Sequence, residues 1–311
     1  MRIISAGEVE AALDFESLVE RLRQAFRRET ISPVRHHHAI ETADDEDATL
    51  LLMPAWQARR HIGLKSVTVF PGNTKRGLPA VMGIYLLLDG KTGSPIALID
   101  GPTLTVRRTA AASALASRYL SRPDCERLLM VGTGALAPHL ILAHAAVRPI
   151  CNVLIWGRTE EKAAKLARHL DRREFRVAHT TDLKAAVRGA HIISCATLSS
   201  EPLVHGAWLQ PGQHLDLVGG FRPDMRETDD ESIRRARVFV DTRAGATEEA
   251  GDIVQPLESG VLSHEDIAAD LYELARGEKA GRRFYDQITL FKSVGTAIED
   301  LAAAQLTVER A

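Results

Sequence analysis

Two glycines, one residue apart, follow a short apolar segment near the middle of the chain. Residues 128–131 (LLMV) lead into Gly132 and Gly134, and Ala137 stands three residues further on. In a turn from a buried strand into a helix, the first glycine permits the tight bend and the second lets the backbone approach a pyrophosphate. N–H groups at the helix start then bind the phosphates. The alternative is a structural turn in another kind of α/β domain. The candidate dinucleotide site consists of Gly132, Gly134, Ala135, Leu136 and Ala137.

The residues after the next apolar segment indicate which dinucleotide this is. Residues 152–156 (NVLIW) are followed by Gly157, Arg158 and Thr159. A protein that prefers NAD usually has a carboxylate here, which bonds the ribose 2′-hydroxyl. This chain has none, and Arg158 and Thr159 offer donors to a 2′-phosphate. We expect NADP(H) to be favoured over NAD(H); alternatively, Arg158 is a solvated residue at the start of a helix.

Basic residues in the first part of the chain lie near the expected ends of strands or helices: Arg35, Lys65, Arg107 and Arg108. Lys65 interrupts the apolar run 62–70 (IGLKSVTVF), where a lysine either faces solvent or meets an anion. Arg108 is expected in the first turn of a helix, where a cation is unfavourable unless an anion joins it. Together these residues can hold a carboxylate, because an arginine guanidinium binds both of its oxygens and the lysine ammonium adds a positive charge beside it. The alternative, for each residue taken singly, is an ordinary surface charge.

From residue 128 onwards, short apolar segments alternate with amphipathic helical segments. This alternation is typical of a parallel sheet covered by helices on both faces. The sequence therefore predicts an α/β protein with a Rossmann-type, doubly wound parallel sheet whose first strand precedes the glycine turn. The expected strands are 128–131, 152–156, 175–179, 191–197, 214–219 and 238–241, and the expected helices between them are 135–147, 159–170 and 182–188.

The first part of the chain has a different pattern. A helix is expected over 6–28, where apolar residues recur every three or four positions. Strand-like segments follow, joined by turns short enough for antiparallel hairpins. Thr103 or Thr105 is expected to cap the helix after them. The strands of this smaller α+β domain, with its antiparallel sheet, are expected at 49–53, 62–70, 80–88 and 95–99, and further helices at 103–120, 264–276 and 289–305.

Composition narrows the class of protein. The 311 residues suggest two domains, and 45% hydrophobic with 26% charged residues is ordinary for a soluble globular chain. A formal net charge of −2 provides no basic field for nucleic acid. The sequence contains no run of about 18 apolar residues, so we expect no membrane span. Cys125, Cys151 and Cys195 are too few for a disulfide framework, so we expect a reducing, cytoplasmic environment.

Two other polar clusters invite interpretation. His36, His37 and His38 are consecutive, and on a strand consecutive side chains point to opposite faces, so they cannot all bind one ion. We expect no metal site. The acidic run 44–47 is expected to be a solvated loop, and Asp100 is expected to be structural.

The chain resembles the ornithine cyclodeaminase/mu-crystallin family over essentially its whole length. The resemblance rests on many segments in the same order rather than on the glycine turn alone. The matching segments are LLMPAW (51–56), GLKSVTVFPGN (63–73), LTVRRTAAASALASRYL (104–120), VGTGALA (131–137), IWGRT (155–159), HLDLVGGFRPDMRETDD (214–230), EEAGDIVQPL (248–257) and TLFKSVGTAIEDLAAA (289–304).

This resemblance implies a two-domain homodimer that acts on small α-amino, α-imino or α-keto acids. A substrate-binding and dimerisation domain, 1–120 with 296–311, is joined to an NAD(P)-binding Rossmann domain, 121–295. In the family, the antiparallel sheet of the first domain typically forms the dimer interface.

The resemblance also assigns roles to residues. At matching positions, Arg35, Lys65 and Arg108 bind the substrate carboxylate. Lys65 is the candidate catalytic residue, because it either completes this carboxylate site or donates a proton. Further residues are implied to bind the cofactor: Thr109, Thr197, Val218, Gly219, Ser293, Val294 and Gly295.

Two positions depart from the cyclodeaminase pattern. Where cyclodeaminases have a glutamate directly before Leu-Met-Pro, this chain has Leu51. Where they have an aspartate directly after Val-Gly-Gly, it has Phe221. Neither side chain can move a proton, so removal of ammonia from ornithine is disfavoured. Residues 222–227 (RPDMRE) instead resemble the reductase branch.

The expected activity is therefore NADPH-dependent reduction of a ketimine carboxylate. Δ1-Pyrroline-2-carboxylate and Δ1-piperideine-2-carboxylate are the leading substrates, giving L-proline and L-pipecolate. A protonated imine is already electrophilic and needs no strong base. The alternatives are ornithine cyclodeaminase, an alanine-type amino-acid dehydrogenase, and a non-catalytic NADPH-binding protein like mu-crystallin. The last is disfavoured because only a substrate anion is expected to hold Arg35, Lys65 and Arg108 together.

Overall fold

The computed structural model describes residues 1–42, 47–170 and 174–311. Within the acidic run that is expected to form a loop, residues 44–46 lie outside this described part. The chain forms two compact units. The first unit contains residues 1–109 and 296–311, and the second unit contains residues 110–295.

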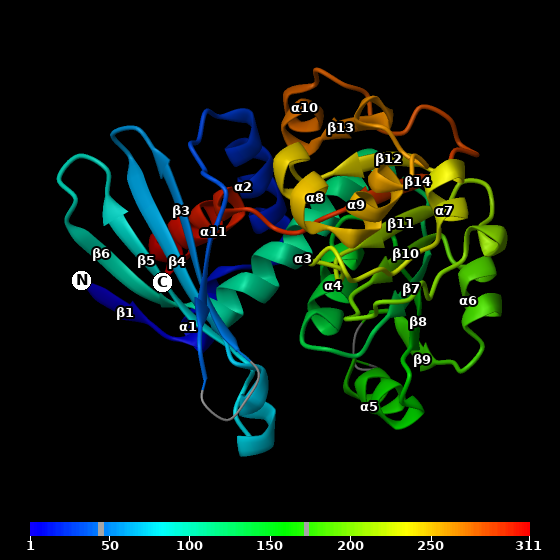
Figure 1. Cartoon of the computed structure of the whole chain (residues 1–311), viewed down its shortest axis with the longest axis horizontal. Coiled ribbons are helices and arrows are strands. Elements are labelled where there is room, and N and C mark those ends of the chain that lie inside the picture. The colour runs from blue at the N-terminus through cyan, green and yellow to red at the C-terminus, as the bar shows by residue number, and fades with distance from the viewer. Residues whose placement is uncertain (43–46, 171–173) are drawn as a thin grey trace. The chain divides into compact units, whose positions relative to one another are not determined.

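A six-stranded mixed sheet forms the framework of the first unit (Figure 1). From β2 to β6, neighbouring strands are antiparallel, and β1 pairs with β6 in parallel. The expected meander is confirmed, and the edge strands β1 and β2 were not predicted. In sheet order the strands are β1 (Arg2–Ile4), β6 (Pro95–Asp100), β5 (Val81–Asp89), β4 (His61–Val69), β3 (Ala48–Gln57) and β2 (His36–Ile40). A 3₁₀ turn, Pro71–Arg76, connects β4 and β5.

Three helices of the first unit pack on or beside this sheet. The single helix predicted over 6–28 is wrong: the chain forms α1 (Ala6–Ala12) and α2 (Phe15–Arg27). Asp14 separates them, because its side chain accepts the Ser17 N–H at 2.9 Å and so caps α2. The C-terminal helix α11 (Ala297–Arg310) lies against β3, β4 and β5 (Figure 1).

Helix α3 (Gly101–Leu120) contains residues of both units. The prediction that Thr103 or Thr105 caps it is wrong. The acceptor is Asp100, the last residue of β6, whose Oδ1 receives the Thr103 N–H at 2.9 Å. Since α3 begins at Gly101, Arg108 lies about two turns inside the helix rather than in its first turn.

An eight-stranded sheet forms the second unit, and all of its strand pairs are parallel (Figure 1). The predicted doubly wound α/β fold is confirmed. In sheet order the strands are β13 (Ile267–Asp270), β12 (Arg237–Val240), β14 (Thr289–Lys292), β11 (His214–Leu217), β10 (Ile192–Cys195), β7 (Arg127–Val131), β8 (Asn152–Trp156) and β9 (Arg176–His179).

Two helices predicted near the C-terminus are only partly correct. Residues 289–292 form β14 between β11 and β12, and residues 267–270 form β13. A short apolar run fits a buried strand or a buried helix equally well, so periodicity alone could not separate the two. The helices of this unit are α4 (Leu136–Ala145), α5 (Glu160–Leu170), α6 (Leu183–Gly189), α7 (Asp230–Arg235), α8 (Arg243–Glu249), α9 (Gly251–Glu258) and α10 (Leu271–Arg276), with 3₁₀ turns at Gly206–Trp208 and His264–Asp266.

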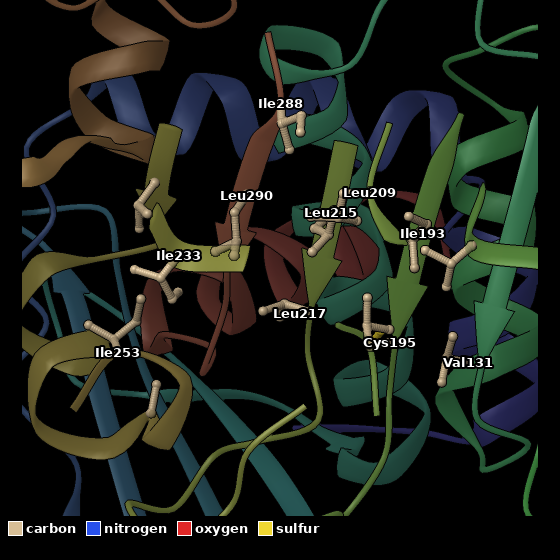
Figure 2. Packing of buried hydrophobic residues seen from close by; sticks show 14 of the residues in the cluster. Val131, Ile193, Cys195, Leu209, Leu215, Leu217, Ile233, Ile253, Ile288 and Leu290 are labelled. Atoms are coloured by element: carbon tan, nitrogen blue, oxygen red, sulfur yellow. The ribbon is translucent and has the colours of Figure 1, made fainter. Parts of the chain in front are cut away.

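A continuous apolar core lies on one face of the parallel sheet (Figure 2). Strand residues such as Val131, Ile193 and Leu217 meet Ile233 of α7 and Ile253 of α9 there. All of these side chains are at most 3% exposed. Because such dense packing leaves the strands little freedom, it fixes the positions of the loops that follow them.

Candidate functional site

The carboxyl ends of the central strands form one edge of the parallel sheet. Val131, the last residue of β7, is opposite Trp156 of β8 and Cys195 of β10. Cys195 is in turn opposite Leu217 of β11, which is opposite Lys292 of β14. The strand order reverses between β7 and β10, and open α/β sheets bind ligands at such a point. The residues proposed to bind cofactor in this unit all follow these strand ends, at 132–137, 157–159, 197, 218–219 and 293–295.

The glycine turn after β7 has the geometry that a dinucleotide requires. Gly132 has a φ of 124°, and a Cβ there would lie 2.5 Å from the Ala196 carbonyl oxygen, so only glycine fits. Gly134 is exposed, and no atom lies within 4 Å of the position of its missing Cβ. The buried Ala137 donates its N–H to the Gly134 carbonyl at 3.1 Å. The turn thus leaves backbone accessible at the start of α4, as a pyrophosphate would need.

The loop after β14 is held by one carboxylate, which the sequence analysis did not identify. Asp241 follows β12, and its Oδ2 accepts the N–H groups of Val294 and Gly295 at 2.8 and 2.7 Å. The Ser293 hydroxyl donates to the same oxygen at 3.2 Å. Asp241 is fully buried. It therefore fixes the whole segment 293–295, three of the candidate cofactor residues.

A second carboxylate joins the loops after β10 and β11. Glu227 Oε1 accepts the Thr197 N–H and hydroxyl at 2.7 and 2.8 Å, and Oε2 accepts the Gly219 N–H at 2.8 Å. Lys292 lies between Glu227, at 4.0 Å, and Asp252, at 3.0 Å. Burial raises the pKa of the Glu227 carboxyl, and the Lys292 charge only partly offsets this. Glu227 is the last residue of the reductase-like segment 222–227, and its spacing in the sequence indicates no role for it.

The first unit contains a buried cluster of two cations and two carboxylates. Lys65 Nζ lies 2.7 Å from Asp300 Oδ2, and Arg108 Nε lies 2.9 Å from Asp300 Oδ1. Arg108 NH1 donates to Glu299 Oε2 at 2.6 Å. The side chains of Lys65 and Arg108 are 2% and 5% exposed, and both acids are fully buried. Because the cluster is shielded from water, its charges interact more strongly than they would in solution.

Three elements bring this cluster together. Lys65 is on β4, directly opposite Tyr85 of β5 in the antiparallel register, so both side chains point to the same face of the sheet. Helix α11 packs on the strands and contributes Glu299 and Asp300 from its first turn. Arg108 comes from α3.

The cluster alters proton affinities. Burial lowers the pKa of Lys65 to about 8, with the Arg108 charge adding to this effect and Asp300 opposing it. Burial acts to raise the pKa of Asp300, but the charges of Arg108 and Lys65 outweigh it, and the pKa is lowered. Lys65 is therefore an ammonium that can release its proton close to neutral pH.

The structure brings Lys65 and Arg108 together, and the half-buried Arg35 is close enough to affect the pKa of Lys65 and of Asp300. Arg107 belongs elsewhere: it donates to the Leu13 carbonyl and lies 4.3 Å from the centre of the Phe15 ring. Thr109, a candidate cofactor residue, lies well inside α3 and is only 7% exposed.

One expectation about these cations is wrong. Their grouping does not require a substrate anion, because Asp300 and Glu299 already supply two negative charges. The segment TAIEDLAAA (296–304) contained a signal for this: two adjacent acids stand among small apolar residues. Such acids are expected to be buried, and buried carboxylates need cationic or hydrogen-bonding partners.

With this geometry in view, comparison with known proteins identifies the family. The chain matches the ornithine cyclodeaminase/mu-crystallin family over residues 1–311. It belongs to this family. The Δ1-pyrroline-2-carboxylate reductase of Colwellia psychrerythraea is 41% identical over 315 residues, which cover 100% of this chain and 99% of the relative.

Solved structures of similar proteins have the same fold as this chain. The Thermococcus litoralis Δ1-pyrroline-2-carboxylate reductase in complex with NADH and L-proline has 34% identity and a TM-score of 0.92, covering 100% of this chain and 97% of that one. An archaeal alanine dehydrogenase dimer with bound NAD has 30% identity and a TM-score of 0.91, covering 100% and 95%. The prediction that the chain is a nicotinamide-dependent oxidoreductase of this family is confirmed.

Proposed function

We propose that the protein reduces a small cyclic ketimine carboxylate, Δ1-pyrroline-2-carboxylate or Δ1-piperideine-2-carboxylate, to the corresponding L-amino acid. The observation that carries this proposal is the buried cluster of Lys65 and Arg108 with Asp300 and Glu299, in a chain whose two positions for the cyclodeaminase acids hold apolar residues. Leu51 lies on the same face of the sheet as Met53 and Lys65, at the position where a cyclodeaminase has its glutamate. Phe221 stands where the aspartate would be, and it is 45% exposed.

The residues have distinct roles in this reaction. Lys65, Arg108 and Arg35 bind the substrate carboxylate, which orients the imine carbon. A bound nicotinamide dinucleotide supplies the hydride, two electrons and a proton nucleus, to that carbon. The C=N π bond breaks, and its electron pair moves to nitrogen. In a protonated imine this pair becomes the lone pair of the amine, and in a neutral imine it takes up a proton to form the N–H bond. With one proton consumed at nitrogen, an imine becomes a secondary amine. Lys65, whose pKa is about 8, is suited to donate that proton.

We propose NADPH as the preferred reductant. Arg158 and Thr159 follow β8 and are exposed, and the four residues 156–159 include no carboxylate that would repel a 2′-phosphate. A Cβ on Gly157 would lie 2.8 Å from Thr133 Cγ2, so this strand end packs closely on the glycine turn. Such packing favours placing the 2′ position of a bound ribose near Arg158. The two solved relatives contain NADH or NAD. The preference of this protein for NADPH over NADH is therefore part of the test below.

We also infer a homodimer. One face of the first unit's sheet is covered by α11, and the side chains of the opposite face are mostly apolar and only partly buried. Ile84, at the middle of this face, is 49% exposed. Exposed apolar surfaces of this extent usually mark an interface. The apolar residues of this face are Leu50, Leu52, Pro54, Trp56, Ile62, Leu64, Met82, Ile84, Leu86, Leu88 and Leu98.

The test is oxidation of reduced nicotinamide by the purified protein. We expect rapid turnover of NADPH with either cyclic imine and slower turnover of NADH. Parallel arms contain pyruvate with ammonia, and ornithine with NAD. Activity confined to the pyruvate arm would mean an alanine-type dehydrogenase, and ammonia release from ornithine would mean a cyclodeaminase. Tight NADPH binding without turnover in any arm would leave a non-catalytic binding protein.

A further inference from the structure

Asp300 contacts both cations of the buried cluster, one through each oxygen. Its Oδ2 is 2.7 Å from Lys65 Nζ and its Oδ1 is 2.9 Å from Arg108 Nε. Glu299, the neighbouring acid, contacts Arg108 through a separate atom, NH1, at 2.6 Å. Asp300 is thus the carboxylate that joins Lys65 to Arg108, whereas Glu299 holds Arg108 from another side.

We propose that Asp300 is the positioning residue of the substrate site: it holds Lys65 and Arg108 in one arrangement and keeps Lys65 protonated. This inference rests on the proposed function for its effect on substrate. Asp300 acts through the two cations and is given no contact with the substrate.

The surroundings of Lys65 explain why a carboxylate is needed there. Arg108 approaches from α3 and adds positive charge, and Arg35 adds more. Tyr85, opposite Lys65 on β5, is fully buried, and burial raises the pKa of its hydroxyl well above the usual value, so it brings no negative charge. Met53, opposite on β3, is apolar. Asp300 on α11 is the charge that opposes the loss of the Lys65 proton.

Helix α11 gives Asp300 a rigid support. The side chains from Ala297 to Thr307 are all buried, so the first turn of the helix is packed on the sheet. A carboxylate on such a turn has little freedom to follow a moving cation. Asp300 therefore holds Lys65 and Arg108 in fixed positions. This lowers the entropy cost of ordering these two side chains when a substrate carboxylate binds.

The first experiment compares Asp300→Asn with Glu299→Gln as the matched control. Both changes remove one carboxylate charge and keep the side-chain size. Lysine Cε NMR titration, with the Lys65 signal assigned by its loss in Lys65→Met, reports the proton affinity without substrate. We expect the wild-type midpoint near 8. It should fall by about one to three pH units in Asp300→Asn and stay in Glu299→Gln, whose lost carboxylate contacts Arg108. An unchanged midpoint in Asp300→Asn would overturn the proposal.

Kinetics with the cyclic imine supply the second readout. In Asp300→Asn, the pH above which kcat falls should move down together with the Lys65 titration, and KM should rise about tenfold or more. In Glu299→Gln, KM should rise while that pH stays in place. If the wild type reduces no cyclic imine, the proposed function fails, and the titration still decides whether Asp300 controls Lys65.

If Asp300→Asn does not fold, a second variant tests the proposal. Asp300→Glu keeps the charge and displaces it by one methylene. The Lys65 midpoint should then stay near its wild-type value while KM rises, because the two cations are no longer held in the same arrangement. Wild-type KM in Asp300→Glu would overturn the positioning role.

Discussion

At the scale of single residues, the two glycines of the turn differ in what they permit. Gly132 has a positive φ and faces the Ala196 carbonyl, so it is required by the fold itself. Gly134 has open space where a side chain would be, so packing does not require a glycine there, whereas the proposed approach of a pyrophosphate would. Arg158, on the loop after β8, is exposed, and its proposed role is a contact with a 2′-phosphate.

Replacing Arg158 tests the cofactor proposal. Arg158→Ala should lower kcat/KM for NADPH by about 10- to 100-fold, since a charge-assisted contact to a phosphate contributes about 1.5–3 kcal/mol. The value for NADH, which has no 2′-phosphate, should change less than about twofold. Arg168→Ala, at an exposed position in the last turn of α5, is the control. Equal losses with both cofactors would contradict a 2′-phosphate contact.

At the scale of elements, the central strands of the parallel sheet contain unusual polar groups. Ser194 of β10 and His144 of α4 both contact Asp216 Oδ2, at 2.7 and 3.0 Å. On β11, His214 Nδ1 lies 2.9 Å from the Thr289 hydroxyl of β14. All of these side chains are fully buried. Burial lowers the pKa of His214 to about 3, more than the Asp216 charge raises it.

This buried imidazole predicts a loss of stability in acid. Between about pH 6.5, where an unfolded histidine titrates, and about 3, the unfolded chain binds a proton at His214 that the folded chain does not. The free energy of unfolding therefore falls as pH falls through this range, by at most about 1.4 kcal/mol per pH unit from this group. His214→Gln should show a shallower decline in urea unfolding, and the exposed His169→Gln should match the wild type. Parallel curves for wild type and His214→Gln would refute this account.

At the scale of the whole molecule, the apolar sheet face of the first unit predicts self-association. Sedimentation should give the wild type about twice the mass of one chain. Ile84→Glu places a charge in the middle of the face, where burial against a second copy would be costly, and the protein should become a monomer. Leu154 is 36% exposed on β8 of the second unit, and Leu154→Glu should leave the dimer intact. A dimer that survives Ile84→Glu would place the interface elsewhere.

Within the described chain, no helix is long and apolar enough to cross a membrane. The molecule consists of two units with different architectures. The parallel sheet of the second unit aligns five loop segments along one edge. In the first unit, a mixed sheet with one helix on its face assembles the ion cluster.

Local patterns in the sequence were sufficient for several features. Strands ending in glycine turns, alternating with amphipathic helices, specify a parallel sheet because each strand is short, apolar and bounded by turn residues. The glycine turn after residue 131 could be assigned a function for the same reason: its spacing reflects backbone geometry, which is local. The basic residues Lys65 and Arg108 could be singled out because a charge within apolar surroundings is visible in a linear sequence.

Only the tertiary structure decided what those charges contact. Asp300 is 235 positions after Lys65 in the sequence, and their pairing depends on how α11 packs across β4. The same holds for β14: its four residues become a central strand because β11 and β12 offer hydrogen bonds on both sides, not because of a local preference. Asp241 holds a loop 53 positions further along the chain, and Glu227 holds one that lies 30 positions before it. Such contacts arise from burial and chain topology. The sequence shows which residues are present, but only the fold shows which of them are in contact.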